Sequence, residues 1–210
     1  ERYAYSTFGY CLLGRLIEKA QTGRKAAYVP WVQANILKPL GIRRMKLGRS
    51  LARFRDKDEV VYHTKNDRTS TSVFANQPGE VPIPYGGWCL EAMDSHGGWI
   101  ASAVDLLRFA TSLDNPAKCP VLKADSIQTM FARPKIASLE NAEPDPVFYG
   151  CGWSVRQTES GLNTWHTGSL DGTSTLLVRR HDGLDWAVLF NTRASAADKP
   201  PAVVLDPLVH

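Results

Sequence analysis

The sequence of 210 residues has no long apolar run and few cysteines. A helix that spans a bilayer needs about 20 consecutive apolar residues, whereas the best stretch, Leu184–Phe190, is interrupted by Asp185. We therefore expect no transmembrane segment. The four cysteines form no C-x-x-C pair, which excludes a zinc ribbon and a thioredoxin-type redox motif. They are Cys11, Cys89, Cys119 and Cys151.

Acidic residues are scarce in the first third of the chain. Residues 1–70 contain 15 Lys and Arg against 6 Asp and Glu, whereas residues 71–210 contain 10 against 15. The densest basic run extends from Lys38 to Lys57, has no aromatic residue besides Phe54, and matches no helix-turn-helix or RNA-binding signature. We interpret it as a solvated basic loop and expect no nucleic-acid partner.

The start of the chain also lacks two common features. The first residue is Glu1 rather than Met, and the residues after it do not have the charged-then-apolar pattern of a signal peptide. We therefore expect that the chain begins inside a longer protein. Its length and its 43% hydrophobic content are those of one globular domain with a substantial core.

Two helices are expected near the N-terminus. Apolar residues recur at helical spacing over Leu12–Ala20, with Ser6 or Thr7 as the N-cap and Gly23 as the stop. A second helix is expected over about residues 27–38, because a Pro-Leu-Gly sequence follows that would end it. These helices belong to a helical and loop part of about residues 1–146.

The rest of this part alternates between loops and helices. Residues 42–100 are rich in Pro and Gly, which predicts long ordered loops with short strands. Ser102 and Asp105 form a capping box for a third helix. A short fourth helix is expected around residues 123–132, and a polar linker over residues 138–146.

From about residue 147 the hydrophobic period becomes two, which is typical of strands. The turn signals Ser160-Gly161 and Asp182-Gly183 predict tight hairpins between neighbouring strands. The sequence therefore predicts an α+β fold in which an antiparallel sheet, over about residues 147–192, is flanked by helices, with a tail over residues 193–210. The expected strands are Tyr149–Gln157, Leu162–His166, Thr173–Arg180 and Asp185–Asn191.

Two segments contain residues suited to chemistry. The run from His166 to Ser169 follows a strand and is read as a loop in which a titratable side chain and a hydroxyl meet flexible backbone. Tyr5 precedes the first helix, whose positive end would lower the pKa of a phenol. Each residue alone also has a purely structural interpretation. His166 could be a half-buried histidine at a strand end, and Tyr5 could be a tyrosine packed on a helix.

Five short segments occur in an order that resembles a known family. The order is similar to that of the serine β-lactamase-related hydrolases, which are class C β-lactamases, DD-peptidases and esterases of the same fold. The resemblance covers nearly the whole chain and implies that residues 1–210 are the C-terminal part of one β-lactamase/transpeptidase-like domain, incomplete at its N-terminus. The segments are Tyr5–Glu18, Leu37–Gly41, Gly97–Phe109, Gly150–Trp153 and His166–Gly168.

The resemblance implies roles for two catalytic residues and their neighbours. Tyr5 matches the general-base tyrosine of a Tyr-x-Asn motif, and His166 matches the first residue of a Lys/His-Thr-Gly motif. Thr167, followed by Gly168, would lie beside the substrate carboxylate or carbonyl. The backbone N–H of Ser169 would form one arm of the oxyanion hole.

The chain departs from the family pattern in two places. Thr7 occupies the third position of the Tyr-x-Asn motif, where it lacks an amide that both donates and accepts hydrogen bonds. The nucleophile motif Ser-x-x-Lys does not occur in the 210 residues. The resemblance thus implies a fragment of a hydrolase that acts on small esters, amides or β-lactams and needs no cofactor. Members of this family are often exported. The fragment is expected to be inactive without the missing N-terminal part of the same protein.

Two other readings remain open from the sequence. The first is a non-catalytic binding or regulatory module with the same fold, which the Thr7 substitution favours. The second is a metal hydrolase that uses His63, Asp94, His96 or His166, although no H-E-x-x-H or comparable ligand spacing occurs, so we expect no metal. The hydrolase reading further predicts that Tyr5 and His166 share one cleft. It also predicts that the strand Leu162–His166 lies at or near an exposed sheet edge or against an incomplete cleft.

Overall fold

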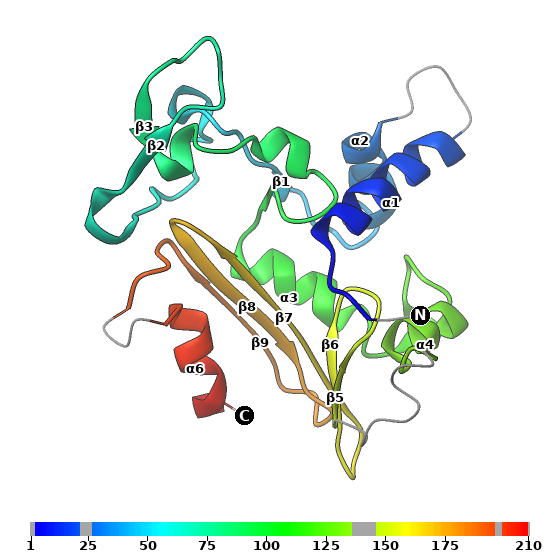
Figure 1. The fold of residues 1–210 in the computed structure, drawn as a ribbon. Helices are drawn as coiled ribbons and strands as arrows, with labels where there is room; N and C mark the ends of the chain where they lie inside the picture. Colours follow the sequence, from blue (N-terminus) through cyan, green and yellow to red (C-terminus); the bar gives the residue numbers. More distant parts are fainter. Residues whose placement is uncertain (1–2, 22–26, 136–145, 196–198, 210) are drawn as a thin grey trace.

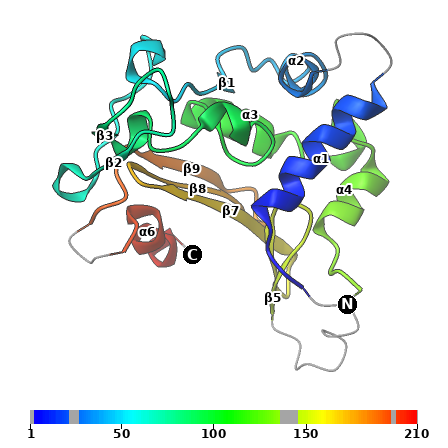
Figure 2. The ribbon, with the colours of Figure 1, turned by 45° about the horizontal axis from the view of Figure 1, so that its top comes forward.

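The computed structural model describes residues 3–21, 27–135, 146–195 and 199–209. These residues form an α+β fold around a five-stranded antiparallel sheet of order β5-β6-β7-β8-β9, which confirms the predicted fold class (Figure 1). Figure 2 shows α3 on one face of this sheet and α6 on the other. No helix in the described ranges is long and apolar enough to cross a membrane.

Helix α1 (Thr7–Ala20) begins where the sequence predicts. The side chain of its N-cap, Ser6, accepts a hydrogen bond of 3.0 Å from the N–H of Gly9 and so satisfies one of the free donors of the first turn. The expected stop, Gly23, lies outside the described residues. The second expected helix is α2 (Tyr28–Val32), which continues as one π-helical segment, η1 (Gln33–Leu37).

The predicted capping box of α3 (Ala103–Thr111) is present. Ser102 Oγ accepts from the N–H of Asp105 at 3.1 Å and donates to the carboxylate of Asp105 at 2.9 Å. Helix α4 (Ala124–Phe131) confirms the fourth prediction. Most of the expected linker at 138–146 lies outside the described residues.

Residues 42–100 form long loops with short strands, as expected. Strand β1 (Lys46–Leu47) pairs with β4 (Trp99–Ile100), and β2 (Thr69–Thr71) pairs with β3 (Glu80–Pro82). Single 3₁₀ turns, four in these loops and one after α3, are η2 (Ala52–Phe54), η3 (Lys65–Asp67), η4 (Ile83–Tyr85), η5 (Leu90–Met93) and η6 (Pro116–Lys118).

Three basic residues of the run pair with acidic neighbours. Arg44 pairs with Asp58, and Lys46 pairs with Asp56. Further along the run, Arg49 contacts Glu91 at 3.0 Å. These pairs reduce the positive charge that the run presents.

The main sheet contains one more strand than the sequence predicts. The segment Tyr149–Gln157 was expected to be one strand, and this prediction is wrong. It is divided between two antiparallel strands by a turn in which Gly152 has a φ of +84°, a conformation that favours glycine. The five strands are β5 (Val147–Tyr149), β6 (Ser154–Gln157), β7 (Leu162–Leu170), β8 (Thr173–Arg179) and β9 (Asp185–Phe190).

The two faces of the sheet carry separate clusters of apolar side chains. On one face, Val155 and Leu177 pack with residues of α3 and α4 such as Ala110 and Ile127. On the opposite face, Leu176 and Val178 pack with Ala202 of α6 (Pro201–Val209). Helix α6 lies in the tail, where the sequence analysis expected no regular element.

Candidate active site

The outer edge of β7 is open along half of its length. Strand β6 pairs with β7 only from Leu162 to Trp165, whereas β8 pairs with it as far as Leu170. Within the described ranges, no strand covers His166–Leu170 on the β6 side. Strand β6 thus covers Leu162–Trp165, and an open edge begins at His166, so the expected strand ends at an exposed edge instead of running along one.

The segment from His166 to Ser169 is part of the strand, not the loop that the sequence analysis expected. The chain turns only at Asp171-Gly172, where Gly172 has a φ of +95°. This two-residue loop is closed by the pair Leu170 and Thr173, which are directly opposite each other. The strand continues because the strong turn residues come after Leu170.

The closing pair fixes which main-chain groups face the open edge. In an antiparallel ladder, hydrogen-bonded and non-hydrogen-bonded pairs alternate, and a two-residue loop is closed by a hydrogen-bonded pair. Gly168 and His166 then bond to β8 through the pairs with Thr175 and Leu177. The main-chain N–H and C=O groups of Thr167 and Ser169 consequently point to the side that β6 leaves uncovered.

The side chains of the same segment alternate between the two faces. His166 is paired with Leu177, which belongs to the cluster under α3 and α4. Thr167 is paired with Leu176 of the α6 cluster, so its exposed side chain and that of Ser169 project from the opposite face. The main chain of Thr167 and Ser169, rather than their hydroxyls, therefore lies beside His166.

His166 is mostly buried and contacts a tyrosine that the sequence analysis did not include in the site. Its Nε2 atom lies 3.0 Å from the hydroxyl of Tyr149, at the end of β5, and the two rings are 6.1 Å apart. Burial lowers the pKa of His166, and a hydrogen bond from the ring to the main chain of Thr167 partly opposes this. At neutral pH the imidazole is therefore uncharged.

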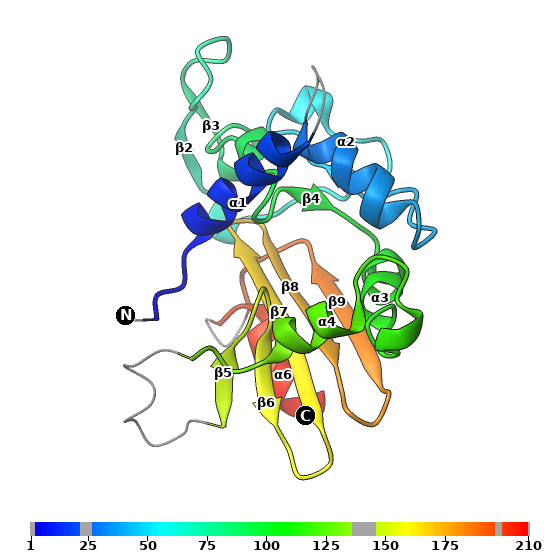
Figure 3. The same ribbon diagram turned by 90° about the vertical axis from the view of Figure 1, so that its right-hand side faces the viewer.

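Tyrosines from the N-terminal stretch and α1 surround Tyr149. The exposed ring of Tyr5 meets Tyr149 edge-on at 5.4 Å, Tyr3 lies at 6.4 Å, and the hydroxyl of Tyr10 bonds to that of Tyr149. Figure 3 shows the stretch before α1 descending towards β5. Burial, and then the neighbouring Tyr10 and Tyr5, raise the pKa of Tyr149, which stays protonated.

The structure thus brings together most of the residues expected in the site. Tyr5 and His166 both contact the ring of Tyr149, and the open main chain of Thr167 and Ser169 is next to His166 in the strand. Thr7 is exposed in the first turn of α1. The catalytic roles of these residues remain predictions.

The other histidines and the acid considered as metal ligands lie elsewhere. Asp94 is bonded to Arg15, and the N–H of His63 donates to the carbonyl of Asn191 at 2.9 Å. In the described part of the chain, no three His, Cys, Asp or Glu side chains lie close enough to hold a metal ion. The metal hydrolase reading gains no support from this arrangement.

Comparison with known proteins gives one family match and several structural matches. The family model described as Beta-lactamase matches residues 1–207. An octameric penicillin-binding protein homologue from Pyrococcus abyssi has a TM-score of 0.68 and 23% identity, over 100% of this chain and 43% of its own. The comparison with curated proteins gave no match.

Two further solved structures have the same fold. A penicillin-binding protein from Bacillus halodurans matches with a TM-score of 0.67 and 14% identity, over 100% of this chain and 57% of its own. A D-amino acid amidase from Ochrobactrum anthropi SV3, in complex with L-phenylalanine amide, matches with a TM-score of 0.59 and 18% identity, over 93% of this chain and 52% of its own. The chain thus spans roughly half the length of these structures.

Proposed function

Because the chain belongs to the β-lactamase family, we propose that it is the C-terminal part of a serine hydrolase that cleaves esters or small amides through an acyl-enzyme. In this proposal the chain supplies the base and the oxyanion side of the active site. The nucleophile belongs to a Ser-x-x-Lys segment that these 210 residues do not contain. The chain alone is therefore inert as a hydrolase.

The observation that carries the proposal is the open edge of β7 beside His166. The main-chain N–H of Ser169 has no strand partner in the described structure and faces this edge. A tetrahedral oxyanion that forms there accepts a hydrogen bond from a donor that is already fixed in the sheet. Such a donor stabilises the transition state without having to reorganise during the reaction.

Tyr5 is proposed as the general base. It precedes the N-terminus of α1, where the helix dipole favours a negative charge, and its ring lies against Tyr149. The neighbouring Tyr149 has a raised pKa and stays protonated, whereas the ring of Tyr5 is exposed and within reach of a substrate.

His166 is proposed to determine the substrate class. A neutral imidazole attracts a substrate carboxylate more weakly than the lysine that β-lactamases usually have at this position. The proposed preference is therefore for esters and small amides over carboxylate-bearing β-lactams. This preference is measured as kcat/KM for an aryl ester and for a β-lactam, in the longer protein and in its His166→Lys variant. A wild-type preference for the β-lactam, or no gain in the lysine variant, would contradict the role of His166.

The role of the Ser169 N–H is tested by removing only that donor. Ser169→Pro deletes the outward N–H at the open edge of β7, where proline removes no hydrogen bond between strands. The expected loss in kcat of the longer protein towards an aryl ester is about 10²- to 10³-fold. Ser169→Ala removes the hydroxyl but retains the main-chain N–H. Its kcat therefore separates the effect of the hydroxyl from that of the N–H.

Leu189→Pro provides the matched control for the backbone effect of proline. Leu189 is on β9, the last strand of the sheet, and alternation directs its N–H away from β8. This variant is expected to retain ester turnover. If both proline variants lose activity equally, the open edge of β7 has no special part in catalysis.

A non-catalytic binding module is the second candidate, and the replacement of the expected Asn by Thr7 favours it. The two candidates differ in the segment that precedes this chain in the longer protein. A Ser-x-x-Lys motif there supports the hydrolase. Its absence, with retained binding of an aryl ester and no turnover, supports the binding module.

A further inference from the structure

We propose that the outer face of α1 is a docking surface for a second copy of this chain, so that two copies form a symmetric dimer through an antiparallel pair of α1 helices. The surface, called the α1 stripe, consists of Phe8, Leu12, Leu13 and Leu16. None of these residues belongs to the candidate active site, and the proposal does not rest on the hydrolase function. Figure 1 shows α1 at the outer side of the molecule.

The opposite face of α1 is already packed against the protein. Gly14 is buried, and a Cβ atom added to it would overlap the side chain of Ser95. Four residues further along, Glu18 accepts a hydrogen bond of 2.9 Å from the N–H of Tyr28 at the start of α2. Residues four apart lie on one face of a helix, so Gly14 and Glu18 define the inner face of α1.

The α1 stripe, in contrast, is turned to solvent. Phe8, Leu12 and Leu16 are spaced by four residues and form one row along the helix, with Leu13 beside it. Single exposed apolar residues are common, but a contiguous apolar patch marks an interaction surface. The exposed fractions are 68% for Phe8, 49% for Leu12, 51% for Leu13 and 61% for Leu16.

No charge interrupts the α1 stripe. Arg15 is the single charged residue between Phe8 and Leu16 in the sequence. Its guanidinium group is bound to Asp94, and it also lies 3.3 Å from the carboxylate of Glu18, on the inner face. A partner that covers the stripe therefore has no charge to desolvate there, which favours a partner that is equally apolar. The stripe of a second copy is such a surface.

The spacing of the stripe makes it self-complementary. With a two-fold axis through Leu12, Phe8 of one copy meets Leu16 of the other, and the two Leu12 side chains meet each other. Such a contact uses the same patch on both copies and closes at two subunits. The antiparallel arrangement also places opposite ends of the two helix dipoles side by side.

The exposed area is that of a reversible dimer. The four side chains offer roughly 450 Å² per copy, compared with about 800 Å² per partner in a standard interface. Lys19, which is exposed at the end of the same helix, can add area at the rim through its methylene groups. Interfaces below the standard size belong to weak complexes, so we expect the dimer to dissociate in the micromolar range.

The mass of the 210-residue chain in solution is the first test. Multi-angle light scattering should give twice 23.2 kDa at about 100 μM and a shift towards the monomer at about 1 μM. Leu12→Lys places two like charges at the two-fold axis, so this variant should be a monomer over the whole range. Its circular dichroism spectrum should not change, because the replaced side chain is exposed. Leu16→Lys decides the question if Leu12→Lys does not fold.

Leu184→Lys is the matched control. Leu184 has a similar exposed fraction, 53%, and lies in the loop between β8 and β9, away from α1. This variant introduces the same charge and should dimerise like the wild type.

A disulfide cross-link tests the position of the two-fold axis. The background is Cys151→Ser, which removes the exposed cysteine. Under mild oxidation, Leu12→Cys should form a disulfide between two copies, because residues on the axis of a close helix pair come within the reach of a disulfide. Leu184→Cys should form none, and peptide mapping identifies the linked cysteines.

A monomer at every concentration would overturn the proposal. A dimer that Leu12→Lys leaves intact would also overturn it, because the interface would then lie elsewhere, such as at the open edge of β7. Cross-linking that is as efficient in Leu184→Cys as in Leu12→Cys would contradict the two-fold axis. None of these measurements needs turnover, so a failure of the hydrolase function would leave them unaffected.

Discussion

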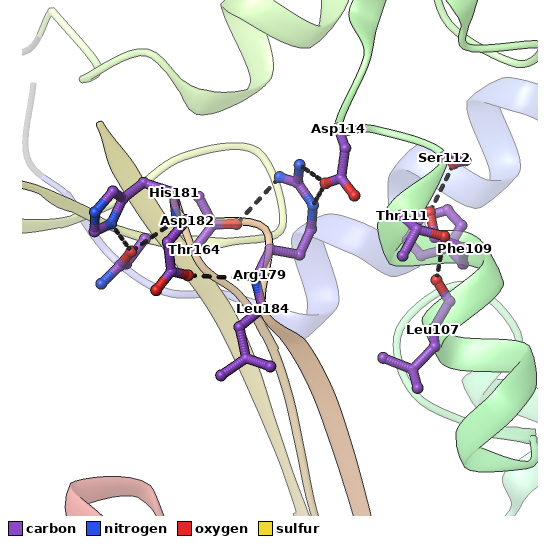
Figure 4. Close-up of polar contacts among 11 residues, drawn as sticks. Leu107, Phe109, Thr111, Ser112, Asp114, Thr164, Arg179, His181, Asp182 and Leu184 are labelled. Carbon is purple, nitrogen blue, oxygen red and sulfur yellow. Dashed lines mark hydrogen bonds and ion pairs between the residues drawn. The ribbon is translucent and has the colours of Figure 1, made fainter. Parts of the chain in front are cut away.

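The guanidinium group of Arg179 on β8 lies 3.1 Å from the carboxylate of Asp114, which follows α3 and is 65 positions earlier in the chain. The same side chain donates to the hydroxyl of buried Thr164 on β7. Figure 4 shows these contacts around Arg179. Arg179 also lies over the ring of Phe131 of α4, at 5.3 Å. One side chain thus connects two helical segments to the sheet that carries the candidate site.

Arg179→Ala is expected to lower the free energy of unfolding by about 1 to 3 kcal/mol, because it leaves the hydroxyl of Thr164 without this partner and removes packing on Phe131. Urea denaturation measures the change. Arg44→Ala is the control, since its ion pair with Asp58 is exposed, and it should change the stability by less than about 0.5 kcal/mol. Equal effects of the two variants would show that Arg179 is an ordinary surface residue.

Asp185, at the start of β9, predicts a pH effect on stability. Burial and the charge of Asp114 raise the pKa of Asp185, while Arg179 partly offsets them. The ionised form is therefore disfavoured in the folded state. The stability contributed by the protonated form is complete below the unfolded pKa and is lost as the pH rises through the raised folded value.

Asp185→Asn should accordingly stabilise the chain at pH 7, with a rise of about 2 °C in the thermal midpoint, because a fraction of 1 kcal/mol has this effect in a domain of this size. The difference from the wild type should shrink as the pH falls below about 4. Thermal unfolding at several pH values measures it. A variant that is less stable than the wild type at pH 7 would contradict the sign.

Gly168 is expected to tolerate no side chain while Thr175 is opposite. The two residues are paired across β7 and β8, and a Cβ atom added to Gly168 would overlap Oγ1 of Thr175. Gly168→Ala should lower the free energy of unfolding by about 1 to 3 kcal/mol through overpacking.

The double variant Gly168→Ala/Thr175→Ala should recover part of that loss, because the overlapping atom is removed. A double-mutant cycle gives the coupling between the two positions. If the two changes are additive, the close approach of the strands does not explain the glycine.

Local signals explain which parts of the fold were predictable. The capping box of Ser102 and Asp105 acts over a few residues and is present. The turn signal Asp182-Gly183 also joins two antiparallel strands, but the pair Arg179 and Asp185 closes a loop of residues 180–184, so the hairpin is wider than the tight one predicted. The Gly-Cys-Gly turn that separates β5 from β6 was missed because the apolar residues on both sides of it have the period of one continuous strand. The sequence predicts the end of this strand at His166, four residues too early, because the Thr-Gly-Ser sequence after it has the composition of a turn.

The candidate site was only partly predictable, because it depends on contacts between segments that are distant in the sequence. Tyr5 and His166 were found through short motifs, but Tyr149 and Tyr10 meet them only because β5 folds back beside β6 and α1 packs nearby. Nothing in the local sequence distinguishes these tyrosines from core aromatics. The open edge of β7 likewise depends on where β6 ends, which is a property of the sheet.

The most direct test of the central claim is covalent labelling of the 210-residue chain with a fluorescent penicillin and a fluorophosphonate probe, followed by mass spectrometry of the intact protein. The account predicts no stoichiometric labelling by either probe, because the chain supplies the base and the oxyanion side without a nucleophile. Under the proposed function, a longer form that includes an upstream Ser-x-x-Lys segment should be labelled on one serine. Stoichiometric labelling of one serine within the 210 residues would contradict the account.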